Sequence, residues 1–440
     1  MEHVIAARAQ MGTSLAFHIV FAALGVGLPL LVFAAEGMWL RTKDRAYYDL
    51  ARSWAKGMAI LFAVGAVSGT ILSFELGLLW PRFMGYAGGI IGLPFSLEGF
   101  AFFIEAIFIG LYLFGWDRLS PRVHWLTALP IAISGPVSAM FITMANAWMQ
   151  MPTGFTLVNG KVTDVHPLTA MFAKPWATEV AHGTLAAFVF TAFGTAAVCA
   201  FAWIRGDRRP QVAAGLRIAM IMGVIALPAQ VVIGDVAARF VAANQPAKFA
   251  AMEALYKTQR GAPMTIGGIP VGGDRVVGAI EIPKMLSVLA TMDPNAEITG
   301  LDRVAAADRP PVFGTHLSFD AMVGSATALL AITLGWLWFV VRKRVLPRFL
   351  EIAIALSGPL ALIALEAGWF VTEFGRQPWI ARGLLRTSDG VTLAPGVDIA
   401  FYGFSILYIV LAIACWWLMR RVDRVPAATG VHGRAMRAVR

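Results

Sequence analysis

The chain has 440 residues, of which 58% are hydrophobic and only 14% are charged. A soluble domain carries about a quarter charged residues, so the composition excludes an ordinary soluble enzyme. The formal net charge of +10 does not indicate nucleic-acid binding, because the basic residues gather in short loops between apolar runs. Both cysteines, Cys199 and Cys415, lie in apolar runs, which excludes a disulfide framework and a zinc site.

Apolar runs of about 20 residues recur along almost the whole chain, and each is long enough to cross a bilayer as a helix. The predicted fold is all-α, a polytopic membrane bundle of about nine transmembrane helices. In chain order the predicted spans are 14–39, 54–80, 93–116, 125–147, 178–204, 216–238, 317–341, 349–372 and 400–419.

Loops rich in Lys and Arg alternate with loops that contain few. The basic clusters are 41–45, 117–122, 205–209, 342–348 and 420–440. Because basic loops stay in the cytoplasm, we expect a periplasmic N-terminus and a cytoplasmic C-terminus in the bacterial inner membrane. The segments 81–92, 148–177, 239–316 and 375–398 are then expected outside, the first as a loop.

The chain therefore divides into four parts. Helices one to six occupy 1–238, a long periplasmic loop occupies 239–316, helices seven to nine occupy 317–419, and a basic cytoplasmic tail occupies 420–440. A loop as long as the second part is more often functional than a passive connector.

Potential metal ligands inside the spans converge on one outer layer of the bilayer. His18 and His182 each lie about one turn after the outer start of an inward-running helix, and Met322 lies at a matching depth. Glu98 and Glu373 also lie toward the outer side. Ionisable groups inside spans are costly and usually mark function. His, Met and carboxylate side chains are potential ligands of haem iron, although each alone also fits a structural role.

Two glutamates of the third span share one helix face. Glu98 and Glu105 are seven residues apart, which corresponds to about 10 Å along a helix. This spacing suits proton transfer toward a buried redox centre, and it equally suits two carboxylates that pair with neighbouring basic residues. Arg376, three residues after Glu373, suits bidentate binding of a carboxylate, and its segment equally suits an interfacial helix stop.

The long loop contains one helix-like stretch, 246–259, in which Pro246 suits the first turn. Lys248 and Glu253 are five residues apart, so on a helix they point about 140° apart and do not form a simple ion pair. Such a Lys and Glu either engage a polar head group or belong to the solvated faces of a surface helix.

At these residues the chain resembles subunit I of the cytochrome bd-type quinol oxidases. The resemblance runs from His18 to Trp379. It is carried by four segments, which are Gly368-Trp-Phe-Val-Thr-Glu-Phe-Gly-Arg-Gln-Pro-Trp379, Glu98-Gly-Phe-Ala-Phe-Phe-Ile-Glu105 with Phe114-Gly-Trp-Asp-Arg118, Asn146-Ala-Trp-Met-Gln150, and Gln245-Pro-Ala-Lys248 with Glu253. The last segment is similar to the quinol-binding loop in its short form.

The resemblance implies a role for each candidate residue. It implies His182 and Met322 as axial ligands of a low-spin haem b, with Glu373 and His18 as ligands of a high-spin haem b and an oxygen-reactive haem, either haem d or a further haem b. It implies that Glu98 lies beside the oxygen-reactive haem and that Glu105 transfers protons. It further implies that Trp369 lies between haems and that Arg376 binds a propionate. Lys248 and Glu253 are implied to bind ubiquinol.

The resemblance also implies partners, namely a second large oxidase subunit (subunit II), a small single-span subunit and membrane lipid, with quinol and O2 as substrates. The chain departs from many members at Asp320, where they carry an Arg two residues before the Met ligand. Its two span-three glutamates are seven apart, whereas some members space them by eight. The short loop also resembles the cyanide-insensitive branch.

Two other functions remain open from the residues alone. One is a di-haem b protein that only relays electrons through the membrane. The other is a cation or proton transporter that uses the same intramembrane His and Glu side chains.

Overall fold

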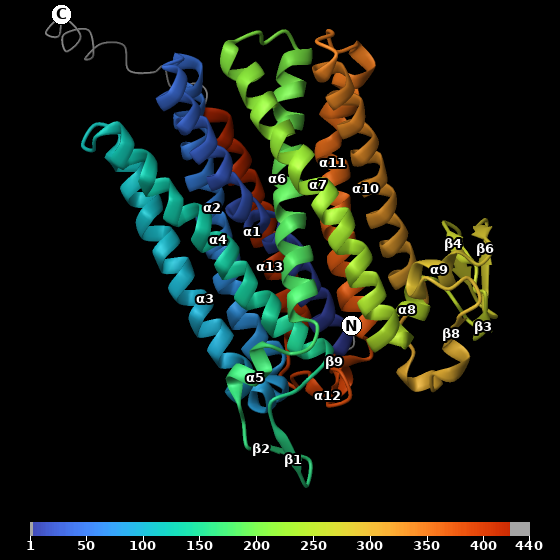
Figure 1. Ribbon diagram of the computed structural model, residues 1–440. Helices are drawn as coiled ribbons and strands as arrows, with labels where there is room; N and C mark the ends of the chain where they lie inside the picture. Colours follow the sequence, from blue (N-terminus) through green and yellow to red (C-terminus); the bar gives the residue numbers. More distant parts are fainter. Residues whose placement is uncertain (1–2, 423–440) are drawn as a thin grey trace, which may run out of the picture.

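The computed structural model describes residues 3–422, most of them in long helices (Figure 1). Within these residues nine helices are long and apolar enough to cross a membrane, which confirms the predicted bundle. They are α1 (His3–Thr42), α2 (Arg45–Leu79), α3 (Pro81–Gly115), α4 (Pro121–Gln150), α6 (Trp176–Ile204), α7 (Pro210–Asn244), α10 (Val312–Val341), α11 (Arg348–Arg376) and α13 (Val397–Val422). Most of the predicted basic tail, from 423 onward, lies outside the described residues.

The two ends of the bundle differ in character. The short connections 43–44, 116–120, 205–209 and 342–347 all lie at the upper end in Figure 1, here called the basic end. The turn between α1 and α2 is only two residues long, and the Asp44 side chain caps α2 by accepting a hydrogen bond from the Ala46 N–H at 2.9 Å. The opposite end, here called the loop end, carries the short helices and strands.

Two apolar cores run along the bundle. One is formed by α1, α6, α7, α10 and α11 and contains the fully buried Phe193, Met220 and Leu329. The second includes residues of α1, α2, α3 and α4, with Leu31 and Ile131 near its centre. Helix α1 contributes to both cores, so it joins the two halves of the bundle.

The expectation of an outer loop at 81–92 was wrong, because this stretch forms the first turns of α3. Pro81 occupies the first helical turn, where its missing N–H costs nothing. Phe83, Ile90 and Ile91 are buried in a cluster that also contains Trp148 of α4. This burial outweighs the low helix propensity of the four glycines in the stretch.

The segment 245–311, between α7 and α10, consists of short elements. They are the helices α8 (Pro246–Met252) and α9 (Met285–Thr291), the 3-10 helices η1 (Leu301–Arg303) and η2 (Ala306–Asp308), and the strands β3 (Gln259–Arg260), β4 (Met264–Ile266), β5 (Ile269–Val271), β6 (Arg275–Val277), β7 (Ile280–Ile282) and β8 (Glu297–Ile298). The strands form three antiparallel pairs, β3 with β8, β4 with β7 and β5 with β6.

A small apolar cluster of Phe249, Leu255, Leu286 and Leu301 holds this segment together. Pro246 lies in the first turn of α8, as expected. The helix predicted over 246–259 ends at Met252, however. The chain leaves the helical conformation at Ala254, whose φ is +49°.

The remaining short elements also lie at the loop end. They are β1 (Thr156–Val158) paired with β2 (Lys161–Thr163), α5 (Pro167–Met171), β9 (Trp379–Ala381) paired with β10 (Leu385–Arg386), and α12 (Thr387–Gly390). The β9 strand is anchored to α4 by the Arg382 N–H, which donates to the Met149 carbonyl at 3.0 Å. These contacts close the loop end of the bundle beside α1, α3 and α4.

Candidate functional site

A cavity of about 1060 Å³ lies among α1, α2, α3, α4 and α11. Six of the ten candidate residues line it, although they come from three different helices. These residues are His18, Glu98, Glu105, Trp369, Glu373 and Arg376. Most of the other lining groups are apolar, so the cavity suits a large flat apolar group with a few polar attachment points.

His18 is held with one ring nitrogen occupied. Its Nδ1 lies 3.0 Å from the Ser68 hydroxyl, whose single hydrogen is directed to the Val64 carbonyl at 2.9 Å or to the Gly65 carbonyl at 3.1 Å. With its hydrogen on either carbonyl, the hydroxyl oxygen accepts from Nδ1, an arrangement that places the ring proton on that nitrogen. This leaves the Nε2 lone pair available, as a metal-ligating histidine requires.

The two span-three glutamates face the same cavity at different depths. Glu98 accepts a hydrogen bond from the Ser138 hydroxyl at 3.2 Å. Glu105 is buried, and a Cβ placed on Gly25 of α1 would lie 3.8 Å from its Oε1. Neither carboxylate has an ion pair with a basic residue in the described part of the chain. The interpretation that each simply neutralises a neighbouring base is therefore not supported.

Glu373 and Arg376 form an ion pair at the end of α11. The Arg376 Nη2 donates to Glu373 Oε2 at 2.5 Å, and the Asn146 amide of α4 donates to Glu373 Oε1 at 3.0 Å. The Nε and Nη1 groups of Arg376 are buried and have no hydrogen-bond partner within residues 3–422. An arginine with two unsatisfied donors beside a cavity is suited to a carboxylate of a bound group.

Glu366 is a cavity residue that the sequence analysis missed. It lies seven residues before Glu373 on α11 and lines the same cavity. Both of its carboxylate oxygens are buried without a hydrogen-bond partner in the described residues. Its heptad spacing from Glu373 matches that of Glu98 and Glu105, and this was the signal in the sequence that would have identified it.

His182 and Met322 lie apart from this cavity and do not line it. Gln230 of α7 lies beside the His182 ring, with its amide nitrogen 3.2 Å from Nε2. A Cβ placed on Gly234 of α7 would lie 3.4 Å from the His182 ring, and a Cβ on Gly368 of α11 would lie 3.2 Å from the Met322 sulfur. No contact between His182 and Met322 themselves appears among the described residues.

The three candidate ligands His18, His182 and Met322 share one feature, which is a glycine on a neighbouring helix. A Cβ on Gly69 of α2 would lie 2.9 Å from the His18 ring, in parallel with the glycines beside His182 and Met322. At each position the candidate ligand packs directly against the glycine, so an added methyl group would crowd it. The unpaired donors of Arg376 and the Nε2 of His18, both beside an apolar cavity, are the features by which the residues present fit haem groups.

Lys248 of α8 is buried against α11. A Cβ on Gly375 would lie 2.6 Å from the Lys248 Cγ, so the lysine stem occupies the space above that glycine. Burial lowers the pKa of Lys248 to about 8, and the nearby Glu179 carboxylate of α6 opposes this shift. Glu179, which the sequence analysis did not select, therefore belongs to the same cluster as Lys248 and Arg376.

Glu253 lies on the other side of α8, near α10. Burial raises the pKa of Glu253 to about 8, and the negative charge of Asp320 adds to the effect. As expected from their spacing, Glu253 and Lys248 have different neighbours. Glu253 is therefore neutral near pH 7, and it holds a proton that it releases as the pH rises through about 8.

Asp320, where many members of the resembling family carry Arg, pairs with His316 one turn earlier on α10, at 3.3 Å. The His316 ring is fully buried, and its Nδ1 and Nε2 face the carbonyls of Met252 and Gly267 at 2.8 and 3.2 Å. His316 thus anchors the 245–311 segment to α10, and Asp320 lies beside its ring on the same helix.

Comparisons with known proteins identify the family of the chain. Residues 6–425 match the family model described as cytochrome bd terminal oxidase subunit I. The chain belongs to this family. It is 39% identical in sequence to a chain in the solved structure of bd oxidase from Geobacillus thermodenitrificans, with a TM-score of 0.91 over 96% of this chain and 98% of that one.

Curated relatives cover almost the full length as well. A Bacillus subtilis strain 168 protein, whose name describes it as a candidate cytochrome bd menaquinol oxidase subunit I, is 37% identical over 95% of this chain and 96% of the relative. The cytochrome bd ubiquinol oxidase subunit 1 of the same organism is 32% identical over 96% and 94%. The chain is therefore a quinol oxidase subunit of the cytochrome bd type, a multi-pass protein of the bacterial inner membrane that works with a subunit II.

Proposed function

We propose that this subunit oxidises ubiquinol at the loop end, on the periplasmic side, and reduces O2 to water with protons taken from the basic end, on the cytoplasmic side. The reaction then separates charge across the membrane and contributes to the proton motive force. The observation that carries this proposal is the cavity of about 1060 Å³. It is lined by His18, by the glutamates of α3 and α11, and by Arg376, which has two donors without a hydrogen-bond partner in the described residues.

The sidedness is supported by the distribution of basic residues. The connections at the basic end contain Lys43, Arg118, Arg205, Arg209 and Lys343, whereas the loop end carries the long segments. Short basic loops remain in the cytoplasm. Protons released by quinol therefore leave on the side of the 245–311 segment, and the protons used for water formation enter from the opposite side.

The quinol site is proposed at α8, with Lys248 and Glu253 as its polar groups. Lys248 provides a cation for a quinol oxygen, and Glu253 in its deprotonated form accepts a quinol proton. The two side chains lie on different sides of α8 and have different neighbours, Gly375 for Lys248 and Asp320 for Glu253, so each would act on a different part of the substrate. Lys248 also lies close to Arg376, which supports a quinol site next to the end of α11.

Four residues are proposed to hold haem iron. His182 and Met322 would hold the low-spin haem b, while Glu373 and His18 would hold a high-spin haem b and the oxygen-reactive haem, either haem d or a further haem b. When bound, these groups supply electron transfer and the reduction of oxygen. The protein residues would orient them: Arg376 would bind a propionate, and Trp369 would lie between haems.

Proton delivery is proposed along α3. Glu105 is buried at the inner part of the cavity and Glu98 lies one heptad nearer the loop end, where Ser138 holds it. Glu105 receives protons from the basic end and passes them toward Glu98. The small single-span subunit and membrane lipid are proposed as further partners of the complex.

Membership of a terminal oxidase family favours this function over the electron relay and the transporter. The test is a reduced-minus-oxidised optical spectrum of the complex with subunit II, followed by addition of carbon monoxide. The oxidase predicts haem bands of which one part shifts with carbon monoxide. Haem bands that do not respond would support the relay, and a colourless complex would support the transporter.

A further inference from the structure

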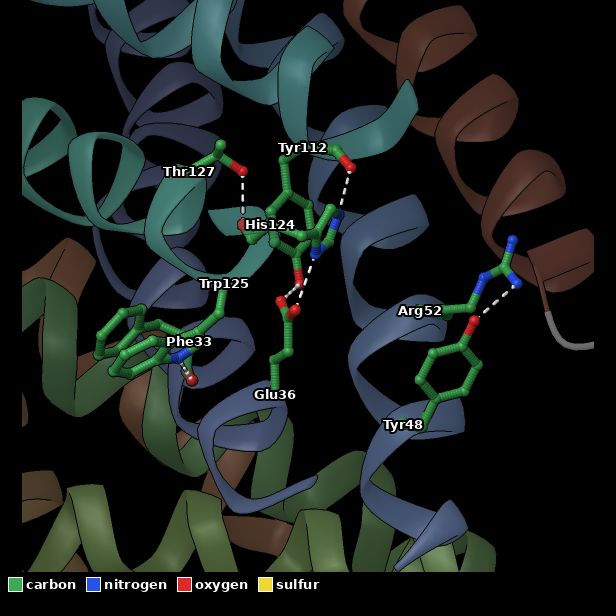
Figure 2. A network of polar contacts seen from close by, with 8 residues as sticks. All are labelled: Phe33, Glu36, Tyr48, Arg52, Tyr112, His124, Trp125 and Thr127. Atoms are coloured by element: carbon green, nitrogen blue, oxygen red, sulfur yellow. Dashed lines mark hydrogen bonds and ion pairs between the residues drawn. The ribbon is translucent and has the colours of Figure 1, made fainter. Parts of the chain in front are cut away.

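A second buried polar cluster lies between the cavity and the basic end, where side chains of α1, α3 and α4 meet (Figure 2). Glu36 of α1, Tyr112 of α3 and His124 of α4 are 0%, 0% and 2% exposed. The Tyr112 hydroxyl donates to Glu36 Oε2 at 2.6 Å, and the His124 Nδ1 lies 2.7 Å from Glu36 Oε1. We name these three residues the inner triad.

The hydrogen bonds of the inner triad fix the number of its protons. The His124 Nε2 lies 2.8 Å from the backbone carbonyl of Tyr112, which only accepts, so Nε2 carries a hydrogen. Tyr112 uses its own hydrogen toward Glu36 Oε2. The short Nδ1 to Oε1 contact then contains one further proton, either on His124 as an ion pair with the carboxylate or on a neutral Glu36. The two forms differ only in which side chain carries this proton, so it is shared between Glu36 and His124 and is here called the labile proton.

The inner triad continues the line of glutamates on α3. Glu98, Glu105 and Tyr112 follow one another at intervals of seven residues, so they share one face of the helix at steps of about 10 Å. Helix α1 follows this face, because Gly25 lies beside Glu105 and Glu36 lies beside Tyr112. The three ionisable positions thus form one seam along α3, from the basic end to the cavity.

The step between Tyr112 and Glu105 is bordered by apolar side chains, including Leu28, Ile109 and Ile131. These side chains offer no polar group to carry a proton, so a proton that passes this step would need transient water molecules. On the other side of the triad, the Trp116 ring packs on both Tyr112 and His124. Two polar side chains of α2 lie next to this ring. The Arg52 guanidinium packs over Trp116 and donates to the Tyr48 hydroxyl at 3.2 Å.

We propose that the inner triad is the proton-loading site at the cytoplasmic end of the path to Glu105, an inference that rests on the proposed uptake of protons from the basic end. In each cycle the labile proton leaves the bond between His124 and Glu36 along the seam of α3. The carboxylate left behind is stabilised by the Tyr112 hydroxyl. A proton from the cytoplasm then restores the original state, so one proton enters for each one that leaves.

The experiment uses the complete haem-loaded complex with subunit II, reduced with quinol and mixed with O2 in weak buffer that contains a pH-sensitive dye. Three variants are compared with the native chain. Glu36→Gln removes the labile proton site, and Tyr112→Phe removes only one hydrogen bond. Glu351→Gln is the matched control, because Glu351 is a carboxylate near the basic end that accepts from Trp203 at 3.0 Å and lies outside the seam.

We expect Glu36→Gln to slow proton uptake about tenfold or more, within the range that positioned proton-transfer groups contribute. Tyr112→Phe should slow it less and increase the difference between H2O and D2O, because Glu36 then holds its proton more tightly. Haem spectra and quinol KM should remain native in both variants, and Glu351→Gln should behave as the native chain.

If both triad variants take up protons at the native rate and with the native isotope effect, the proposal is overturned. The inner triad would then be only a structural contact between three helices. If Glu36→Gln fails to assemble with haem, Tyr112→Phe decides the matter by the same two readouts. A native complex that consumes no O2 with quinol would instead contradict the proposed function.

Discussion

The side chain of Lys248 lies directly on Gly375, so a residue of the 245–311 segment fills the space beside the ion pair of Glu373 and Arg376. A Cβ on Gly375 would lie 2.6 Å from the Lys248 Cγ and 2.9 Å from its Cε. The candidate quinol site and the candidate haem cavity therefore share a wall.

Gly375→Ala is expected to weaken quinol binding. The added methyl group displaces the Lys248 stem and with it the ammonium group, so quinol KM should rise about tenfold, equivalent to about 1.4 kcal/mol. Haem content should remain native, since Gly375 is not a ligand. The control is Gly77→Ala in α2, where a Cβ meets nothing within 4 Å. An unchanged KM in Gly375→Ala, measured from O2 consumption, would show that Lys248 does not bind quinol.

The pH dependence of quinol oxidation should have two limbs that meet near pH 8. Glu253 must be deprotonated to accept a proton, and its pKa is raised to about 8, so kcat/KM should increase with pH below this value. Lys248 must be charged, and its pKa is lowered to about 8, so kcat/KM should fall above it. Glu253→Gln should remove the rising limb and Lys248→Gln the falling limb. Identical profiles in both variants would reject these assignments.

His182→Ala and Met322→Leu should each remove the low-spin haem signal and leave carbon monoxide binding largely intact. The reason is that neither residue lines the cavity around His18 and Glu373. His18→Ala should have the opposite effect, with loss of a carbon monoxide-reactive haem and a retained low-spin signal. Optical and electron paramagnetic resonance spectra provide the measurement. Loss of all haem signals together in each variant would point to a common folding defect.

Arg376→Met should release haem and destabilise the subunit. The substitution removes the partner of Glu373 and the two free donors proposed to bind a propionate. Leaving a buried group without its partner costs about 1–3 kcal/mol, so the thermal transition of the complex should fall by several degrees. The haem-to-protein ratio and the melting temperature measure the two effects. A native haem ratio would mean that Arg376 acts only on Glu373.

Much of the architecture follows from the sequence, because apolar runs of about 20 residues have few alternatives to a membrane helix. The shared depth of His18, Glu98 and Glu373 was visible as well, since helix rise converts position into height. The separation of His182 and Met322 from the main cavity was not visible in the sequence, because residues at equal height can lie on different sides of a bundle.

Other features depend on packing between distant parts of the chain. Glu36 and His124 lie 88 residues apart, and each looks like an interfacial side chain in its own segment. The helix at 81–92 was missed because its glycines suggest a loop until the burial of Phe83 and Ile90 against other helices is known. Glu366 and Glu179 carry no local signal other than spacing, and only the cavity and Lys248 reveal their surroundings.

The most direct test of the central claim is an experimental density map of the complex with subunit II. The account predicts three planar densities with an iron centre, one bonded to His18, one to Glu373, and one between His182 and Met322. Lipid or water in the cavity, or iron bonded to other side chains, would contradict it.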